Sequence, residues 1–441
     1  MPSEEIAQQS HARRPLKAPL AVAVCILIGV HAIPTLAQCE DYRRVNIAAQ
    51  LGPRPGFLVD QLQDGPLKTQ LQSCRTRVFR KHDFSIGHRG ACMQFPEHTL
   101  ESYVAAARQG AGIIECDVTF TGDGELVCRH SQCDLHTTTN IVTIPALNAK
   151  CEQPFEPATF DADGNKLTNA SARCCTSDIS LEEFRMLTGK MDASNPNAAT
   201  PEEYLSGTAD WRTDLYSGPV SSGTLMTHAE SVQLFRTMRV KVTPELKAPS
   251  VQMPFELLDG TDFTYDNYRQ KLIDELRDGG IRPSDAWVQS FVRTDIDYWI
   301  ANEPEFARQA VYLIPADNPT ELAPFEAELS SYQAAGINYV APAMWALVEA
   351  NGTDIAPTSY ATTAKAEGLK IITWTLERSG LVADGSGGYY YQLLGEVLAD
   401  RQNEGAILEV LDVLAQDVGI DGIFSDWPAT VTFYANCVLA R

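Results

Sequence analysis

The sequence predicts an α/β fold, a TIM (β/α)8 barrel with an inserted subdomain after the third strand. From residue 84 onward, short apolar runs alternate with longer helical stretches, and strands separated by helices indicate βαβ units in a parallel sheet. About eight such units in a chain of this length favour a closed barrel over an open, doubly wound sheet. The chain contains no Gly-x-Gly-x-x-Gly turn and no Walker loop, so a nucleotide-binding fold has no support.

The predicted elements follow from the length and the apolar character of each run. Short apolar runs predict the strands, which are, in order, 84–88, 112–119, 125–130, 240–246, 286–290, 310–314, 339–342, 370–375 and 422–425. Longer stretches between them predict the helices 100–109, 228–238, 265–278, 320–335 and 390–418.

The strands and helices define a barrel domain at 81–430, preceded by an N-terminal extension at 38–80 that we expect a disulfide to tether. Residues 131–223 break the alternation, because they show little periodicity and are rich in Thr, Asn, Asp and Pro. We predict that this segment is an insertion, which leaves the barrel after the strand that ends at His130.

The first 37 residues are predicted to be a secretory signal peptide. Arg13, Arg14 and Lys17 precede an apolar stretch at 18–33, and small residues up to Ala37 resemble a cleavage site. An uncleaved membrane anchor is the alternative, although the apolar stretch is short for a span. We expect a secreted or periplasmic protein with no stable membrane insertion once the signal is cut.

The cysteines also favour export. Removal of the predicted signal takes away Cys25 and leaves ten of the eleven cysteines, an even number that suggests several disulfides in an oxidising compartment. The connectivity cannot be read from the sequence. The cysteines in loop or terminal contexts are the better candidates, namely Cys74, Cys133, Cys151, Cys174, Cys175 and Cys437. Cys116 lies inside a predicted strand and is interpreted as a buried thiol.

The formal net charge of −22 limits which kinds of partner the protein can bind. Phosphate backbones and anionic membranes bind basic surfaces, so this charge argues against nucleic acid and against broad membrane adsorption. An anionic substrate must therefore be attracted locally. The oligomeric state is left open by the sequence.

Side chains that carry chemistry gather at the ends of the first four predicted strands. Active sites of barrel enzymes lie on the rim formed by the carboxyl ends of the strands, so we expect these side chains to meet there. They are His88 and Arg89 on the first strand, Glu115 and Asp117 on the second, His130 on the third, and Glu245 and Lys247 on the fourth.

The residue types at this rim suit phosphodiester chemistry. Glu115, Asp117 and Glu245 offer three carboxylates to one hard divalent cation, Ca²⁺ or Mg²⁺. The two histidines can take up and return a proton, and the positively charged side chains of Arg89 and Lys247 can hold phosphoryl oxygens. Each residue alone has a plainer interpretation as a solvated or capping side chain, and it is their joint position on one rim that favours the functional interpretation. His98 is interpreted as part of a helix start, where Glu97 and Thr99 bond backbone N–H groups.

A series of motifs in a fixed order resembles the glycerophosphodiester phosphodiesterases. The motifs span about 84–428 and are His88-Arg89-Gly90, Pro96-Glu97-His98-Thr99, Glu115-x-Asp117, Asp123-Gly124-Glu125 leading to His130, Glu245-Leu246-Lys247, Trp374-Thr375 and Asp421-Gly422-Ile423-Phe424-Ser425-Asp426. The resemblance implies a TIM barrel, one divalent cation, and hydrolysis of small glycerophosphodiesters to sn-glycerol 3-phosphate and an alcohol. It also implies attack by the substrate's own hydroxyl to give a cyclic phosphate.

The resemblance assigns a role to each residue at the rim. His88 and His130 become the acid–base pair, and Glu115, Asp117 and Glu245 the metal ligands. Arg89 and Lys247 become phosphate-binding, Trp374 a wall for the glycerol, and Phe291 a weaker candidate for the pocket.

Two rival functions stay open at this point. A related phospholipase D-type barrel enzyme acting on lysophospholipid or sphingomyelin shares paired histidines and carboxylates. The second rival is a non-catalytic binding protein with the same barrel. The intact set of histidines and carboxylates argues against it.

Overall fold

The computed structural model describes residues 48–209, 211–217, 222–385 and 387–440. The predicted signal peptide, and the start of the predicted extension as far as residue 47, lie outside this part of the chain. Within it, no helix combines the length and the apolar character that crossing a membrane requires.

Eight parallel strands close into a barrel, as predicted. Their order around the barrel is β1 (His82–Gly87), β17 (Gly422–Ser425), β16 (Lys370–Thr373), β13 (Tyr339–Ala341), β12 (Val311–Leu313), β11 (Gln289–Ser290), β8 (Lys241–Leu246) and β2 (Ala111–Phe120). The barrel is closed because β1 pairs with both β17 and β2. Apolar side chains such as Ile86, Ile113 and Val311 form a cluster of buried residues from these strands.

The third strand of the chain, β3 (Leu126–Cys128), does not belong to the barrel. β2 continues past its neighbours, and the turn at Gly124 sends the chain back so that β3 pairs antiparallel with the end of β2. The insertion follows β3, as predicted, but the next strand of the barrel is β8. A run of apolar residues does not say with which strand it pairs, so the sequence could not distinguish β3 from a strand of the barrel.

Helices surround the barrel, and several begin at a polar cap. Thr or Asn side chains accept hydrogen bonds from backbone N–H groups at the starts of α4 (Leu100–Arg108), α9 (His228–Met238), α10 (Tyr265–Asp278), α13 (Pro319–Tyr332) and α14 (Ser359–Ala366). Further helices are α11 (Arg293–Asn302) and α17 (Ala429–Tyr434). The helix predicted at 390–418 is instead broken into α15 (Gly395–Arg401) and α16 (Ala406–Asp412), because Gln402 takes a left-handed conformation between them.

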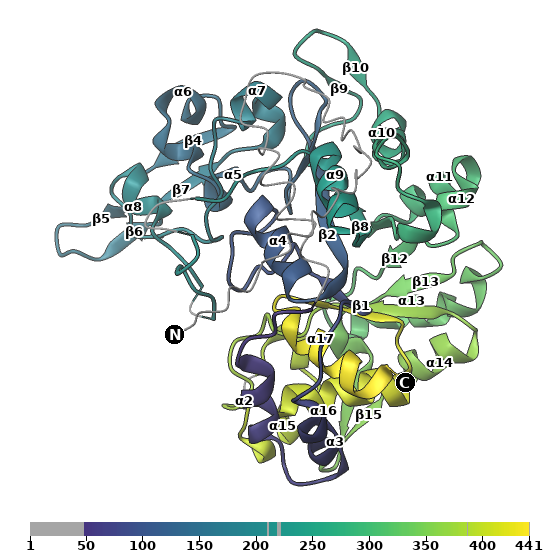
Figure 1. The fold of residues 1–441 in the computed structure, drawn as a ribbon. Coiled ribbons are helices and arrows are strands. Elements are labelled where there is room, and N and C mark those ends of the chain that lie inside the picture. The colour runs from purple at the N-terminus through teal and green to yellow at the C-terminus, as the bar shows by residue number, and fades with distance from the viewer. Residues whose placement is uncertain (1–47, 210, 218–221, 386, 441) are drawn as a thin grey trace, which may run out of the picture.

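The segment predicted as an insertion forms a lobe beside the barrel, at the upper left of Figure 1. It contains four short helices, α5 (Leu135–Thr138), α6 (Pro145–Asn148), α7 (Leu181–Phe184) and α8 (Pro201–Leu205), and the strand pairs β4 (Gln153–Glu156) with β7 (Ser171–Arg173) and β5 (Thr159–Phe160) with β6 (Lys166–Thr168). Its buried residues, among them Ile141, Phe184 and Tyr204, form a cluster separate from that of the barrel.

Four disulfides link cysteines of the described chain. They join Cys74 to Cys437, Cys116 to Cys128, Cys133 to Cys175 and Cys151 to Cys174. The interpretation of Cys116 as a free thiol was wrong, since the antiparallel return of β3 brings Cys128 opposite this part of β2. Cys92 is the one cysteine in the described residues that stays unpaired.

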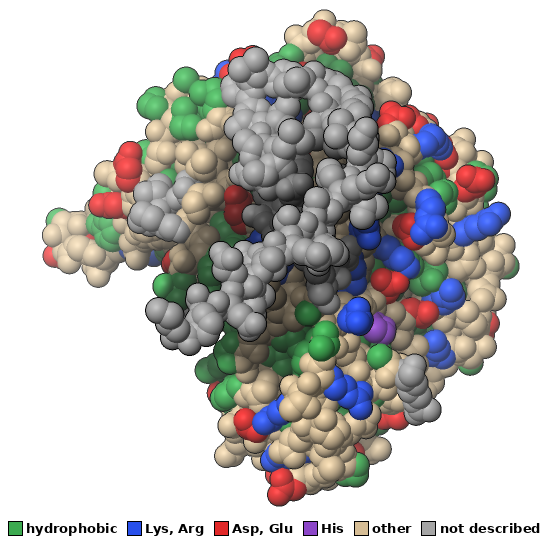
Figure 2. Space-filling model, in the orientation of Figure 1, with side chains coloured by type: hydrophobic (Ala, Val, Ile, Leu, Met, Phe, Trp, Pro, Cys, Tyr) green, Lys and Arg blue, Asp and Glu red, His purple; other side chains and the backbone are tan. Residues whose placement is uncertain are grey.

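The N-terminal helices α2 (Arg54–Gln61) and α3 (Pro66–Cys74) lie beside the C-terminal end of the chain (Figure 1). The disulfide of Cys74 and Cys437 provides the predicted tether for them. On the face shown in Figure 2, Lys and Arg side chains lie interspersed with Asp and Glu side chains toward the right-hand edge.

The tether leads to a prediction for stability. Replacing both Cys74 and Cys437 by Ser should lower the free energy of unfolding by about 2–5 kcal/mol, because the bond closes a loop of almost the whole chain. Urea unfolding of the oxidised protein measures the loss. The two single substitutions serve as controls and should each lose about as much as the pair. An unchanged unfolding midpoint in the double variant would contradict the prediction.

Candidate active site

Three carboxylates lie together at the carboxyl ends of β2 and β8. Asp117 and Glu245 are register partners on these adjacent strands, and Glu115 precedes Asp117 by two residues and shares its face. One oxygen from each of the three carboxylates lies within 4.8 Å of the others, and all three side chains are buried. Strand alternation turns Cys116 to the opposite face, as the sequence predicted.

The three carboxylates repel one another, and cations offset this only in part. Burial raises the pKa of Glu115 well above its usual value, and Asp117 and Glu245 raise it further. Burial also raises the pKa of Glu245, to about 7, although Lys247 lies 2.6 Å from its Oε1. The Oδ1 atom of Asp117 is buried and has no hydrogen-bond partner among the described residues. The donor set therefore suits a hard cation, which would supply the missing positive charge.

Arg89 lies against two of these carboxylates. Its backbone N–H donates to Glu115 Oε2 at 2.9 Å, and its guanidinium Nε lies 3.6 Å from Asp117 Oδ2. The guanidinium also donates to Glu97 Oε2 at 3.0 Å. Burial would raise the pKa of Glu97, but Arg89 and Arg378 outweigh it and hold that pKa well below its usual value. The expectation that Glu97 bonds backbone N–H groups at the start of α4 was wrong, since the Glu97 carboxylate instead bonds the guanidinium of Arg89.

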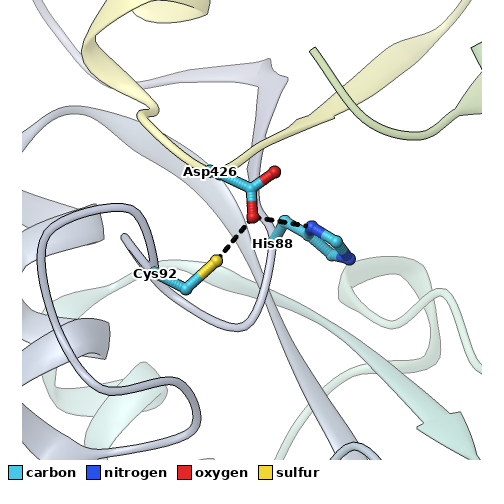
Figure 3. Close-up of side chains that lie close together, drawn as sticks. All are labelled: His88, Cys92 and Asp426. Atoms are coloured by element: carbon cyan, nitrogen blue, oxygen red, sulfur yellow. Dashed lines mark hydrogen bonds and ion pairs between the residues drawn. The ribbon is translucent and has the colours of Figure 1, made fainter. Parts of the chain in front are cut away.

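His88 is a buried, neutral imidazole held by a carboxylate. Its Nδ1 lies 3.1 Å from Asp426 Oδ1 (Figure 3). Its Nε2 lies 3.8 Å from Glu115 Oε2. Burial lowers the pKa of His88 to about 4, against the opposing effect of Asp426. A proton on Nδ1 satisfies the Asp426 carboxylate and leaves Nε2 with a free lone pair, which faces the three-carboxylate cluster.

Asp426, which follows β17, is itself held by several donors. Arg378 donates from Nε at 3.0 Å, Thr375 donates its hydroxyl at 2.8 Å, and the Cys92 thiol donates at 2.5 Å. Burial would raise the pKa of Asp426, but Arg378 and His88 hold it well below its usual value. The carboxylate that orients His88 is therefore ionised and fixed.

His130 is half-buried and follows β3. Burial holds its pKa well below the usual value, and the nearby cations Arg89 and Lys247 lower it further. No hydrogen bond of its imidazole is found within the described part of the chain. The structure thus brings the seven side chains that the sequence placed on the rim close to one another.

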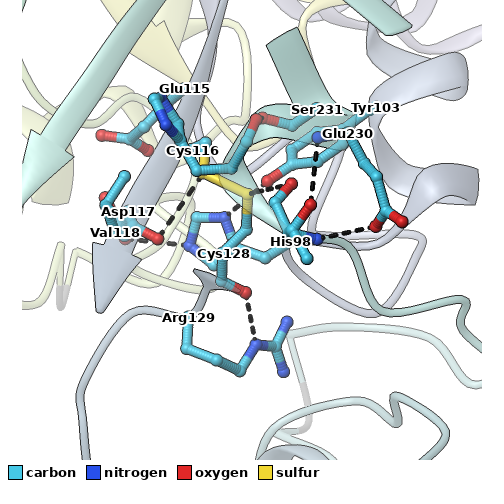
Figure 4. The surroundings of a disulfide bond; sticks show 12 residues. His98, Tyr103, Glu115, Cys116, Asp117, Val118, Cys128, Arg129, Glu230 and Ser231 are labelled. Carbon is cyan, nitrogen blue, oxygen red and sulfur yellow. Dashed lines mark hydrogen bonds and ion pairs between the residues drawn. A yellow bond between two sulfur atoms is a disulfide. The ribbon is translucent and has the colours of Figure 1, made fainter. Parts of the chain in front are cut away.

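His98 reaches the site more directly than the sequence indicated. It is fully buried between Tyr103 and Asp117, with Nδ1 3.0 Å from the tyrosine hydroxyl and Nε2 2.9 Å from Asp117 Oδ2 (Figure 4). The disulfide of Cys116 and Cys128 lies beside this group. The sequence offered no signal for the contact, because His98 and Asp117 come from different elements. Thr99 caps α4, as expected.

Aromatic rings stand next to the cationic part of the site. Trp374 packs edge-on against Phe291 at a centroid distance of 5.7 Å, and Tyr389 and Tyr390 contact its ring at 6.3 and 6.0 Å. The Lys247 ammonium lies 5.8 Å from the centroid of Phe291. These four half-buried rings are called the aromatic wall below.

Sequence reasoning missed three further residues. Asp426 and Gln289 stand at the ends of predicted strands, so their position was a usable signal. Arg378 lies in the loop after β16, where no pattern indicated a role. Gln289 donates from Nε2 to Glu115 Oε1 at 2.9 Å.

Comparisons with known proteins give a consistent result. The model of the glycerophosphoryl diester phosphodiesterase family matches residues 88–430. An extracellular protein of Arthroderma benhamiae is 42% identical over 251 residues, which cover 56% of this chain and 99% of that protein. A glycerophosphodiester phosphodiesterase of Arabidopsis thaliana is 22% identical over 410 residues, which cover 88% of this chain and 93% of that protein.

Solved structures resemble the chain at low identity. A putative glycerophosphoryl diester phosphodiesterase from Silicibacter pomeroyi is 17% identical with a TM-score of 0.48, and the match covers 83% of this chain and 97% of that one. An Oleispira antarctica phosphodiesterase in complex with the product sn-glycerol-3-phosphate is 17% identical with a TM-score of 0.45, and the match covers 80% and 96%.

The pairing of Glu97 leads to a prediction for stability. Glu97→Gln should lower the free energy of unfolding by about 3–5 kcal/mol, because it leaves the buried Arg89 and Arg378 short of a counter-charge. Thermal or urea unfolding measures the change. Glu182→Gln is the matched control, since Glu182 is exposed, and should change the free energy by less than about 0.5 kcal/mol. Equal effects in the two variants would show that the Glu97 pairs do not stabilise the fold.

Proposed function

The chain belongs to the glycerophosphoryl diester phosphodiesterase family, and from that premise we propose that it hydrolyses small glycerophosphodiesters to sn-glycerol 3-phosphate and an alcohol at the rim described above. The protein is an enzyme of the phosphodiesterase class. The observation that carries the proposal is the meeting of Glu115, Asp117 and Glu245 with His88 and the cation Arg89 at one end of the barrel.

Arg89 and Lys247 are proposed to bind the phosphate. Both side chains are cationic and lie next to the carboxylate cluster, Arg89 by Asp117 and Lys247 by Glu245. Arginine offers a planar fork to two phosphoryl oxygens, and lysine offers a compact charge. In a chain of formal charge −22, these two side chains provide the local attraction that an anionic substrate needs.

Glu115, Asp117 and Glu245 are proposed to hold one divalent cation, Ca²⁺ or Mg²⁺. The residues fit such an ion, because all three donors are hard oxygens and the buried Oδ1 of Asp117 has no other partner among the described residues. When bound, the ion supplies Lewis-acid polarisation of the phosphate and neutralises developing negative charge.

His88 is proposed to act as the general base. The neutral imidazole takes the proton of the substrate's own hydroxyl at Nε2, while Asp426 holds Nδ1–H and stabilises the imidazolium that forms. The deprotonated oxygen attacks phosphorus and gives a cyclic phosphate, with no second molecule to be recruited. Asp426 thereby acts as a positioning residue.

His130 is proposed to protonate the leaving alkoxide. Burial, together with Arg89 and Lys247, holds its pKa low in the structure, and the negative charge of a bound phosphate offsets those two cations. Substrate binding therefore raises the proton affinity of His130 when an acid is needed. In the second half of the reaction, water opens the cyclic phosphate and the two imidazoles exchange proton roles.

The aromatic wall is proposed to line the substrate pocket, with Trp374 against the glycerol carbons. Its support is the contact of Phe291 with Lys247, which places the rings beside the cations proposed to bind phosphate.

The domain bounds, the role of the insertion and the export of the protein are proposed as well. Residues 81–430 form the catalytic domain, and the insertion at 131–223 limits which alcohol can enter. The protein is exported after loss of residues 1–37, which is supported by the four disulfides and by an extracellular relative.

Product analysis tests the function. The purified protein should release glycerol 3-phosphate from glycerophosphocholine, glycerophosphoethanolamine or a related diester. Chelation by EDTA should abolish this release, and Ca²⁺ or Mg²⁺ should restore it. Ceramide phosphate from sphingomyelin, or a cyclic lysolipid phosphate, without any glycerol 3-phosphate release, would instead establish the phospholipase D-type activity.

Substitutions test the proton-transfer roles. His88→Ala should lower kcat by a factor on the order of 10³ or more, and Asp426→Asn by about 10²–10⁴, because each removes the oriented base. His82→Ala is the matched control at the opposite end of β1 and should retain near-normal kcat. Circular dichroism checks that each variant is folded. Full turnover by folded His88→Ala would refute the assignment and favour a non-catalytic or differently built site.

A further inference from the structure

We propose that Gln289 supplies a fourth, neutral oxygen ligand to the divalent cation at the three-carboxylate cluster, through its side-chain carbonyl Oε1. The inference rests on the proposed function, because it concerns the same cation. It adds a residue from a third strand, β11, to the two strands that carry the carboxylates.

Strand register brings Gln289 to the level of the site. β11 pairs with β8 so that Gln289 is the partner of Glu245, and β8 pairs with β2 so that Glu245 is the partner of Asp117. Register partners on neighbouring parallel strands point to the same face. Asp117, Glu245 and Gln289 therefore form one row across three adjacent strands, with Glu115 one step below on β2.

The amide group of Gln289 lies at the cluster. Its Nε2 donates to Glu115 Oε1 at 2.9 Å. In the metal-bound state Glu115 is ionised and can only accept, so the amide then presents its N–H group to Glu115 and keeps Oε1 free for the ion. The side chain is only 1% exposed. Its Oε1 is nevertheless without a hydrogen-bond partner among the described residues.

Two buried oxygens of this row thus lack a partner, Gln289 Oε1 and Asp117 Oδ1. Unpaired buried acceptors are unfavourable, and a cation bound at the cluster would give both oxygens a partner. Amide carbonyls are regular ligands of Ca²⁺ alongside carboxylates. A neutral fourth ligand also adds coordination without adding to the mutual repulsion of the three acids.

The alternative is that Gln289 does not bind the cation and only positions the Glu115 carboxylate through its Nε2 hydrogen bond. The two roles differ in their response to the softness of the metal. A direct ligand exchanged for a sulfur atom shifts the preference of the site from Ca²⁺ toward the thiophilic Cd²⁺. Loss of a bond to Glu115 weakens the binding of both ions alike.

The test measures the dissociation constants of Ca²⁺ and Cd²⁺ by calorimetry on the full-length, EDTA-treated protein. Gln289→Leu should weaken Ca²⁺ binding by about 10- to 100-fold and Cd²⁺ binding to a similar degree. Gln289→Met is neutral, similar in size and unable to donate to Glu115. It should weaken Ca²⁺ binding as much as Gln289→Leu does but retain Cd²⁺ binding, so that the preference for Cd²⁺ over Ca²⁺ rises at least about tenfold.

Controls separate the possible outcomes. Gln309→Leu removes a half-buried glutamine that bonds the backbone of Ala286 away from the row, and it should bind both ions like the unaltered protein. Cys92 is present in every variant, so the difference between the Met and Leu variants reports on position 289. If the Leu variant does not fold, the Met variant compared with the unaltered protein decides the question.

Three results would overturn the inference. They are unchanged Ca²⁺ binding in folded Gln289→Leu, an equal loss of Ca²⁺ and Cd²⁺ in Gln289→Met, and a site in the unaltered protein that binds neither ion. The last result removes the metal site itself. The release of glycerol 3-phosphate, assayed separately, then shows whether the proposed hydrolysis stands without it.

Discussion

Concentrated negative charge at the carboxyl ends of β2 and β8 is the constraint around which the rest of the site is built. Three buried carboxylates this close together cannot all ionise without compensation, and the structure supplies it from several directions. The cations are Arg89, from the loop after β1, and Lys247, from the end of β8, while the buried His98, from the segment before α4, adds a hydrogen bond to Asp117. The segments that carry Arg89 and His98 are therefore held in place by their contacts with the buried carboxylates. The same compensation leaves a local surplus of negative charge, which the proposed divalent cation would offset.

A second network orients His88, the proposed base, and depends on strands at the far end of the chain. His88 follows the first strand of the barrel, whereas Asp426 follows the last, and barrel closure makes these two strands neighbours. Arg378, from the loop after β16, fixes Asp426 and also approaches Glu97, which pairs with Arg89. The carboxylate that holds His88 and the arginine proposed to bind phosphate are thus parts of one ionic network. Proper placement of either requires the whole barrel to be closed.

Sequence reasoning succeeded where the information is local. Apolar runs identified the strands, and helix caps such as Thr99 marked where helices begin. It failed where pairing is decided by distant parts of the chain. β3 has the composition of a barrel strand, and only its antiparallel pairing with β2 excludes it from the barrel. Cys116 was misinterpreted for the same reason, since its partner Cys128 lies on β3. Gln289 lies on a predicted strand, but its relation to Glu245 depends on the register of two strands separated by a helix.

The Cys116–Cys128 disulfide joins two parts of the rim that carries the proposed catalytic residues. Cys116 stands between Glu115 and Asp117 in the chain, and Cys128 stands two residues before His130. One covalent bond therefore connects the strand of the proposed metal ligands to the segment that carries the proposed acid. A newly made chain acquires this connection only by oxidation, so maturation of the site is coupled to the redox state of the surroundings in which the chain folds. Oxidative folding would then act as a checkpoint that precedes full assembly of the catalytic machinery.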